Sequence, residues 1–374
     1  MKIIAFYLPQ FHNIPENDEW WGNGFTEWTN VKKAKPLFEG HQQPKVPLNN
    51  NYYNLLDDNV KVWQADLAKK YGVYGFCYYH YWFNGKMLLE KPMEQMLENK
   101  EVDIPFCISW ANEPWTKAWV GDEKKMLIAQ EYGQEEEWKE HFMYLLPFFK
   151  DERYIKKDGK PFFVFYRPDI VPCMKEMIDL WNSISFAFQC GDYDWNNSKE
   201  ADLFDYDIEF QPPYASHWLY SNDGKVIALL KKWRRLLAGW AGKKFGIDLY
   251  RYGTARYKKM TGQTIANYDA MWKKIIDAKP LRDNSIPGAF VKWDNTPRHG
   301  DRGQVNVGTP EKFKYYLSKQ IKHAKNDYHE DMIFMYAWNE WAEGGYLEPD
   351  EDDKYGYLEA IKAALEENNE FPNY

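Results

Sequence analysis

The sequence MIFMYAWNEWAEGG begins at Met332 and joins a short apolar run to two acidic residues. Its first six residues are predicted to form a buried β-strand, because they are continuously apolar. Strand side chains alternate between faces, so Glu340 and Glu343 would point in opposite directions on an unbroken strand. They can share a pocket only if the strand stops near Asn339 and the chain bends, which the Gly344-Gly345 pair allows. Two carboxylates beside Trp side chains at a strand end are typical of glycoside chemistry.

The rest of the chain contains seven similar apolar runs, mostly separated by segments with helical spacing. Continuous apolar runs suit parallel strands that are buried on both faces. Eight β-α alternations predict an α/β fold of the (β/α)8 TIM barrel type, with residues 1–374 forming a single domain. A doubly wound sheet is the alternative, but the chain has no glycine-rich phosphate-binding loop. The eight predicted strands are 3–11, 74–83, 105–110, 162–166, 184–189, 206–210, 289–293 and 332–337.

Helices are predicted at 59–71, 135–149 and 172–181, from Thr309 onward and around 357–365. Two connections are long: residues 12–57 follow strand 1, and residues 212–287 follow strand 6 and are expected to hold two helices. The second connection contains a basic stretch, 225–244, that could contact a membrane surface. We favour the interpretation that it is the solvated face of a surface helix.

The composition excludes some functions. The net charge of −8 makes nucleic acid an unexpected partner. The 18 Trp and 28 Tyr residues could fill a core, or could stack on the C–H faces of sugars. The four cysteines have no zinc spacing and are expected to be reduced. No metal or cofactor is expected. The chain shows neither a membrane-spanning run nor a signal sequence, so a cytoplasmic location is predicted.

The unusual polar and aromatic residues cluster where strands are predicted to end, which is where a barrel of this kind builds its active site. Glu340 and Glu343 are the candidate catalytic residues. Among the other candidates, His12 and His80 could be ordinary core histidines, and Asp294 could form a local ion pair with Arg298. The candidate substrate-binding residues are Tyr7, Gln10, His12, Glu27, Trp28, Tyr79, His80, Trp82, Trp110, Asn112, Glu113, Trp115, Glu209, Trp293, Asp294, Arg298, Asn339 and Trp341.

Several of these motifs carry a family resemblance. The segments 4–12, 24–28, 75–82, 110–113 and 339–344 are together similar to the WbsX-type proteins, a branch related to the endo-acting α-mannosidases of glycoside hydrolase family 99. The resemblance extends over almost the whole chain and also implies a (β/α)8 barrel. Its motifs are specific for the family and less so for the substrate.

The resemblance implies roles for the two carboxylates. Glu340 would deprotonate the 2-hydroxyl of the substrate, whose oxygen then attacks the anomeric carbon and forms an anhydro-sugar. Glu343 would protonate the departing oxygen and then activate water. The result would be cleavage or transfer of a glycosidic bond, with retention, in a bacterial polysaccharide or oligosaccharide.

Three alternatives remain open. The first is an ordinary double displacement, with Glu113 as acid/base and Glu340 as nucleophile. The second is a WbsX-type glycosyltransferase of O-antigen or surface-polysaccharide synthesis, the label commonly given to this branch. Against it, the Asp-x-Asp segment 205–207 falls at the start of strand 6, the wrong end for a metal motif in an active site. The third is a barrel that binds carbohydrate without catalysis.

Overall fold

The computed structural model describes residues 1–117, 122–191, 199–216 and 266–374. The predicted basic stretch 225–244 and most of the second long connection lie outside these residues.

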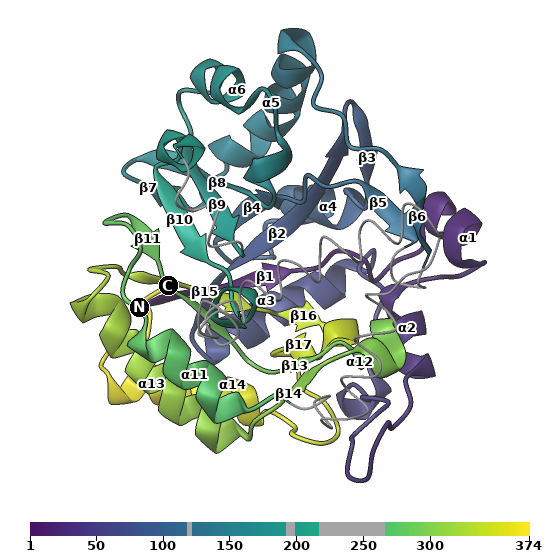
Figure 1. Cartoon of the computed structure of the whole chain (residues 1–374), viewed down its shortest axis with the longest axis vertical. Helices are drawn as coiled ribbons and strands as arrows, with labels where there is room; N and C mark the ends of the chain where they lie inside the picture. Colours follow the sequence, from purple (N-terminus) through teal and green to yellow (C-terminus); the bar gives the residue numbers. More distant parts are fainter. Residues whose placement is uncertain (118–121, 192–198, 217–265) are drawn as a thin grey trace, which may run out of the picture.

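A parallel sheet forms the centre of the molecule (Figure 1). Its strands pair in the order β11-β10-β9-β8-β4-β2-β1-β15-β12. Short antiparallel strands flank the sheet or pair with each other at its edges. The strands of the central sheet are β1 (Lys2–Tyr7), β2 (Val73–Phe83), β4 (Phe106–Trp110), β8 (Lys160–Phe165), β9 (Ser185–Cys190), β10 (Tyr206–Glu209), β11 (Ser285–Ile286), β12 (Gly288–Phe290) and β15 (Met332–Tyr336). The short strands are β3 (Lys86–Leu88), β5 (Trp115–Lys117), β6 (Asp122–Ile128), β7 (Lys156–Lys157), β13 (Trp293–Asp294), β14 (Val305–Asn306), β16 (Asn339–Glu340) and β17 (Gly345–Tyr346).

The sheet closes into a barrel at Pro287. The two ends of the strand order, β11 and β12, are separated in sequence by this proline alone. Ser285 pairs with Asp207 of β10, and Gly288 pairs with Phe334 of β15, so the segment 285–290 bridges the sheet edges. Gly288 is required here, because an added Cβ atom would lie 1.9 Å from the backbone oxygen of Glu209.

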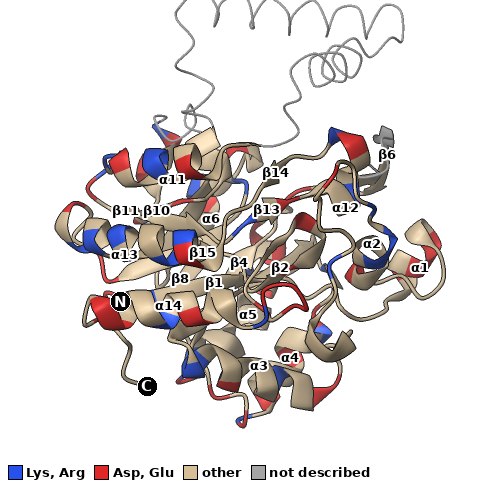
Figure 2. Ribbon diagram, turned by 90° about the horizontal axis from the view of Figure 1, so that it is seen from below, with Lys and Arg blue, Asp and Glu red and all other residues tan. Residues whose placement is uncertain are grey.

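Helices cover the outside of the barrel, and charged residues are concentrated on them (Figure 2). Helix α13 packs against α11 and α14 (Figure 1). Thr309 caps α13 by accepting a hydrogen bond from the Lys312 backbone, and Pro310 occupies the first turn, as the sequence predicts. The helices are α1 (Pro15–Trp21), α2 (Glu27–Lys33), α3 (Asp58–Lys70), α4 (Lys91–Glu98), α5 (Glu135–Lys150), α6 (Met174–Leu180), α11 (Tyr268–Asp277), α12 (Thr296–His299), α13 (Pro310–Asn326) and α14 (Gly356–Glu367).

The predicted α/β barrel is therefore confirmed. Each of the eight predicted strands overlaps a barrel strand. The seventh, predicted at 289–293, overlaps β12, and β11 just before it was not predicted. The strand predicted at 3–11 ends at Tyr7, because Pro9 has no backbone N–H for sheet pairing. The predicted first long connection contains α1 and α2.

Two further predictions concern the cysteines and membrane-spanning helices. All four cysteines, Cys77, Cys107, Cys173 and Cys190, are free thiols, as expected. Within the described ranges, no helix is both long and apolar enough to cross a membrane.

Candidate active site

The geometry of the site begins with the bend that the sequence predicts after β15. The strand ends at Tyr336, and Asn339 and Glu340 form the short strand β16. A single 3-10 turn, η6 (Trp341–Glu343), follows directly, and Gly344 adopts a left-handed conformation with φ 63°. The turn brings both carboxylates to the same side of the chain, where both line one pocket.

Arg298 of α12 joins the two carboxylates. Its guanidinium donates to Glu343 Oε1 and, at 3.3 Å, to Glu340 Oε2. Its Nε donates to Oε1 of Glu27 at 3.0 Å. One buried cation thus contacts three carboxylates, and the Arg298 side chain is only 6% exposed. A buried charge cluster of this kind holds its members in fixed positions.

The two carboxylates differ in their surroundings. Burial raises the pKa of Glu340 to about 8, with Arg298 opposing the rise and Glu343 adding to it. Glu343 is more accessible, with 19% of its side chain exposed. Its Oε2 accepts a hydrogen bond from the Tyr336 hydroxyl at 2.5 Å. Burial therefore makes the Glu340 carboxyl a weaker acid, and its carboxylate a stronger base, than an exposed glutamate.

The pocket has a volume of about 390 Å³ and lies at the carboxyl ends of the barrel strands. Aromatic side chains make up much of its wall, and a few polar groups converge on it, which is the usual composition of a ligand pocket. Its lining residues are Leu8, Gln10, Trp21, Tyr79, Tyr81, Ala111, Glu113, Pro114, Trp115, Thr116, Leu127, Tyr166, Phe210, Pro213, Trp293, Arg298, Tyr336, Glu340 and Glu343.

Eight candidate residues from the sequence meet in this pocket: Gln10, Tyr79, Glu113, Trp115, Trp293, Arg298, Glu340 and Glu343. Glu113 has a side chain that is 41% exposed and lies 3.8 Å from Arg167. Burial raises the pKa of Glu113, and the nearby Arg167 guanidinium opposes that rise.

The structure places the other candidates around the pocket rather than in its wall. Several of them hold neighbouring segments together. Asn339 bonds both the N–H and the carbonyl of Leu8, and Asn112 does the same for Arg167.

Other candidates make single contacts. Tyr7 donates to Gln64 of α3, and Glu209 accepts from Tyr328. Trp28 packs on Trp341, His12 bonds the Pro9 carbonyl, and Trp110 donates to the Trp82 carbonyl.

Strand alternation explains which residues of β2 reach the pocket. Tyr79 and Tyr81 both line it, so the intervening His80 points to the opposite face. There His80 lies 2.9 Å from His141 of α5, and Trp82 stacks on His141 with ring centroids 4.4 Å apart. Sequence reasoning missed Tyr81, and the period of two starting from Tyr79 could have found it. Tyr166, Phe210, Tyr336 and Trp21 were also missed.

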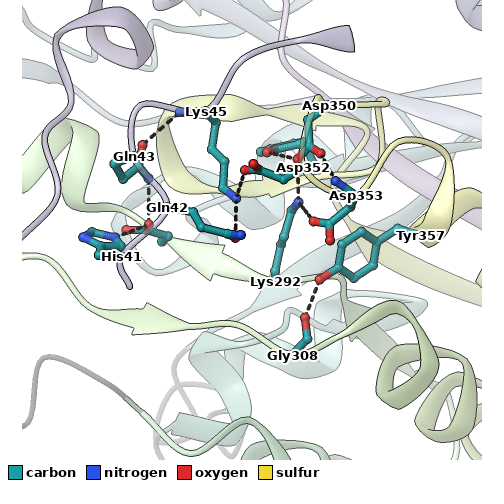
Figure 3. Close-up of polar contacts among 12 residues, drawn as sticks. His41, Gln42, Gln43, Lys45, Lys292, Gly308, Asp350, Asp352, Asp353 and Tyr357 are labelled. Carbon is teal, nitrogen blue, oxygen red and sulfur yellow. Dashed lines mark hydrogen bonds and ion pairs between the residues drawn. The ribbon is translucent and has the colours of Figure 1, made fainter. Parts of the chain in front are cut away.

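Asp294 does not pair with Arg298. Its Oδ2 bonds His41 at 2.8 Å and Gln43 at 2.7 Å, and its Oδ1 accepts from Thr296. The segment containing His41 and Gln43 is held in turn by Lys45, which bonds Asp352 (Figure 3).

Lys292 makes a second link behind the site. It is buried and reaches Asp350 at 3.1 Å and Asp353 at 3.3 Å (Figure 3). These contacts fix the end of β12 and the segment after β17 against each other.

No group of three or more His, Cys, Asp or Glu within the described residues is arranged to hold a metal ion. Acid–base chemistry on an acetal needs only positioned proton donors and acceptors.

The chain matches a family of known proteins. The family model described as Glycosyltransferase WbsX matches residues 3–361. WxcX proteins from two strains of Xanthomonas campestris pv. campestris are 32% identical over 97% of this chain. The match covers 49% of their length, so the chain spans about half of these relatives.

Among solved structures, the glycoside hydrolase family 99 endo-alpha-mannosidase from Bacteroides thetaiotaomicron superposes with a TM-score of 0.56 and 13% identity, over 98% of this chain and 97% of that one. A protein described as glycoside hydrolase-like gives a TM-score of 0.51 and 11% identity, over 100% of this chain and 94% of that one. At these identities the likeness shows the fold.

The fold and the family together support a carbohydrate-active enzyme. The chain belongs to the WbsX glycosyltransferase family.

Proposed function

We propose that the chain is a single-domain retaining enzyme that cleaves or transfers a glycosidic bond in a bacterial polysaccharide or oligosaccharide. The observation that carries the proposal is the convergence of Glu340 and Glu343 on Arg298 in an aromatic pocket at the carboxyl ends of the strands. Glycosidases generally use such a carboxyl pair, with one member as acid.

In the first step, Glu340 accepts the proton of the substrate's 2-hydroxyl. The 2-oxygen attacks the anomeric carbon while the bond from that carbon to the leaving oxygen breaks. Glu343 donates its proton to the leaving oxygen. Tyr336 and Arg298 then stabilise the negative charge that Glu343 acquires, because both already donate to it.

In the second step, Glu343 takes a proton from water, or from an acceptor hydroxyl in the case of transfer. The resulting oxygen attacks the anomeric carbon and the anhydro bond breaks. Glu340 returns its proton to the 2-oxygen. Two inversions give overall retention. The raised pKa of Glu340 makes its carboxylate a stronger base toward the 2-hydroxyl in the first step.

The other predicted residues divide into two groups in this proposal. The candidates Gln10, Tyr79, Glu113, Trp115, Trp293 and Arg298 contact the substrate or the reacting carboxylates, because they line the pocket. The remaining candidates act by holding those residues in place.

The test compares wild type, Glu340→Gln and Glu343→Gln on a panel of bacterial polysaccharides and mannosides, with new reducing ends as the readout. Release by wild type that is lost in both variants supports the proposal. Glu113→Gln is included, because a severe effect there with a mild effect at Glu343 would favour ordinary double displacement.

A WbsX-type glycosyltransferase of O-antigen or surface-polysaccharide synthesis is the second candidate, favoured by the family to which the chain belongs. It predicts no water-dependent release and a higher melting temperature in the presence of a nucleotide sugar.

A further inference from the structure

A second hollow, of about 310 Å³, adjoins the pocket that contains Glu340 and Glu343. Tyr166, Phe210 and Pro213 line both spaces and form the boundary between them. The second hollow lies over the carboxyl ends of β8, β9 and β10, which are neighbours in the barrel (Figure 1). A ligand longer than one sugar unit could therefore extend from the first space into the second.

A paired arginine and carboxylate stand in the wall of the second hollow. Arg167 donates to both oxygens of Asp169, at 2.8 Å and 2.7 Å. The two side chains are 42% and 27% exposed, so both remain accessible to a ligand. Asn112 fixes the Arg167 backbone with two hydrogen bonds, which places the pair before any ligand arrives.

The charges of the two spaces disfavour an anionic ligand. Their described walls contain four carboxyl groups, from Glu113, Asp169, Glu340 and Glu343, against the guanidinium groups of Arg167 and Arg298. Both arginines already contact carboxylates. Among the described residues, an anion would therefore have to displace a carboxylate from one of these ion pairs before either arginine could bind it.

A neutral sugar fits this wall. A hydroxyl can donate to Asp169 and another can accept from Arg167 without breaking the ion pair, because each group has further hydrogen-bonding capacity. The rings of Tyr166 and Phe210 provide apolar surface for the C–H face of a sugar.

We propose that the second hollow is a subsite for a neutral sugar unit, and that the substrate is an uncharged oligosaccharide that extends from the reacting unit across Tyr166 and Phe210. This inference rests on the proposed function and adds the class of substrate.

The test blocks the second hollow without touching the first. Among the described residues, the nearest atom to a Cβ at Gly191 would be Pro213 Cβ, 3.8 Å away, so a side chain can be added here. Gly191→Leu places its branches at the wall of the hollow. The full chain carrying Glu343→Gln, to prevent turnover, is applied to an array of neutral and acidic bacterial glycans, and the glycans that bind are then titrated.

Two further variants are made in the same background. Asp169→Asn removes the carboxylate that pairs with Arg167. Ser183→Leu adds the same side chain at an exposed position just before β9, at its opposite end, and controls for effects of the added leucine on folding.

The proposal expects neutral oligosaccharides to bind, Gly191→Leu to weaken them by about tenfold or more, and Asp169→Asn to weaken them by a similar factor. Ser183→Leu should leave affinity and melting temperature unchanged. Three results would overturn the subsite: preferential binding of acidic glycans, binding of neutral glycans unaffected by Gly191→Leu, or no binding of any neutral glycan.

The assay also separates this inference from the proposed function. Gly191→Leu is therefore also made without Glu343→Gln. Cleavage of a neutral glycan by wild type that this single variant leaves unchanged supports the function and overturns the subsite. Neutral glycan binding that Gly191→Leu weakens, without turnover by wild type, supports the subsite and overturns the function.

Discussion

Tyr336 donates its hydroxyl hydrogen to Oε2 of Glu343 at 2.5 Å, although the two residues belong to different elements, β15 and η6. A residue of β15, the strand that precedes Glu340 and Glu343, thus holds the Glu343 carboxylate in place. The turn after β15 makes this possible, because it folds residue 343 back over the end of the strand.

Replacing Tyr336 with Phe should lower kcat. The variant loses a hydrogen bond to a carboxylate, which contributes about 1.5–3 kcal/mol, or roughly tenfold to hundredfold in rate if it is made in the transition state. Steady-state kinetics on a cleaved glycan measure the effect. Tyr374→Phe is the matched control, because its hydroxyl bonds the Val73 carbonyl and does not line the pocket. An unchanged kcat in Tyr336→Phe would show that the contact is only structural.

Glu340 should make the stability of the wild type depend on pH. Burial raises its pKa in the folded state from 4.5 to about 8, so folding favours the protonated form. The contribution of Glu340 to stability is complete below pH 4.5 and is lost as the pH rises through 8. Glu340→Gln stays neutral and should therefore melt at a higher temperature than wild type at about pH 9, with the difference shrinking toward about pH 5.

Melting curves of both proteins at the two pH values check this prediction. Glu39→Gln, at an exposed position, should follow the wild type. A difference in melting temperature that is the same at both pH values would mean that the effect of Glu340→Gln does not come from its ionisation.

Glu348→Ala should lower the stability of the protein and disturb the turn that contains Trp341. The Glu348 carboxylate is buried and accepts from Tyr53 at 2.8 Å, Gln64 at 2.7 Å and Trp341 at 2.7 Å. The alanine variant leaves these donors without their acceptor, at a cost of about 2–5 kcal/mol in the free energy of unfolding. Because Trp341 lies in the chain between the two proposed catalytic carboxylates, Glu340 and Glu343, kcat should fall more than KM changes.

Chemical denaturation and kinetics on the same preparation test both effects. Glu351→Ala removes an exposed carboxylate three residues away and should change stability little. Equal stability losses in the two variants would contradict the proposed support of Trp341.

Gly288→Ala should disturb closure of the barrel. The added methyl group would lie 1.9 Å from the Glu209 carbonyl oxygen, and a backbone atom cannot move aside easily. We expect a loss of about 1–3 kcal/mol or more in the free energy of unfolding, measured by denaturation. Gly191→Ala, whose methyl group has its nearest neighbour at 3.8 Å, should be far milder. A variant at Gly288 that is as stable as wild type would rule out the tight approach.

Much of the barrel was predictable because its strands are buried on both faces. Most of them appear in the sequence as nearly continuous apolar runs, such as Phe162–Phe165 within β8, and this pattern depends only on local composition. The boundaries were less predictable. Strand β11, which Pro287 separates from β12, was not predicted, and the end of β1 depends on Pro9.

The site residues on β2 could not be told apart from their neighbours by the sequence alone. On β2, the four residues from Tyr79 to Trp82 are aromatic or imidazole side chains of similar size. Only the orientation of the strand relative to the barrel axis decides that Tyr79 and Tyr81 face the pocket while His80 faces α5. That orientation is a property of the packed sheet.

The sequence by itself determined the apolar strands from which the barrel was predicted. It also placed Glu340 and Glu343 in one short motif that bends near its glycines. The strands and the motif both depend on residues that lie close together in the chain. The tertiary structure decided the electrostatics. Arg298 meets Glu27 across 271 residues and Glu340 across 42, and burial of that cluster raises the pKa of Glu340. Contacts across such separations depend on how the barrel closes, because only the closed sheet brings the ends of distant strands to one pocket.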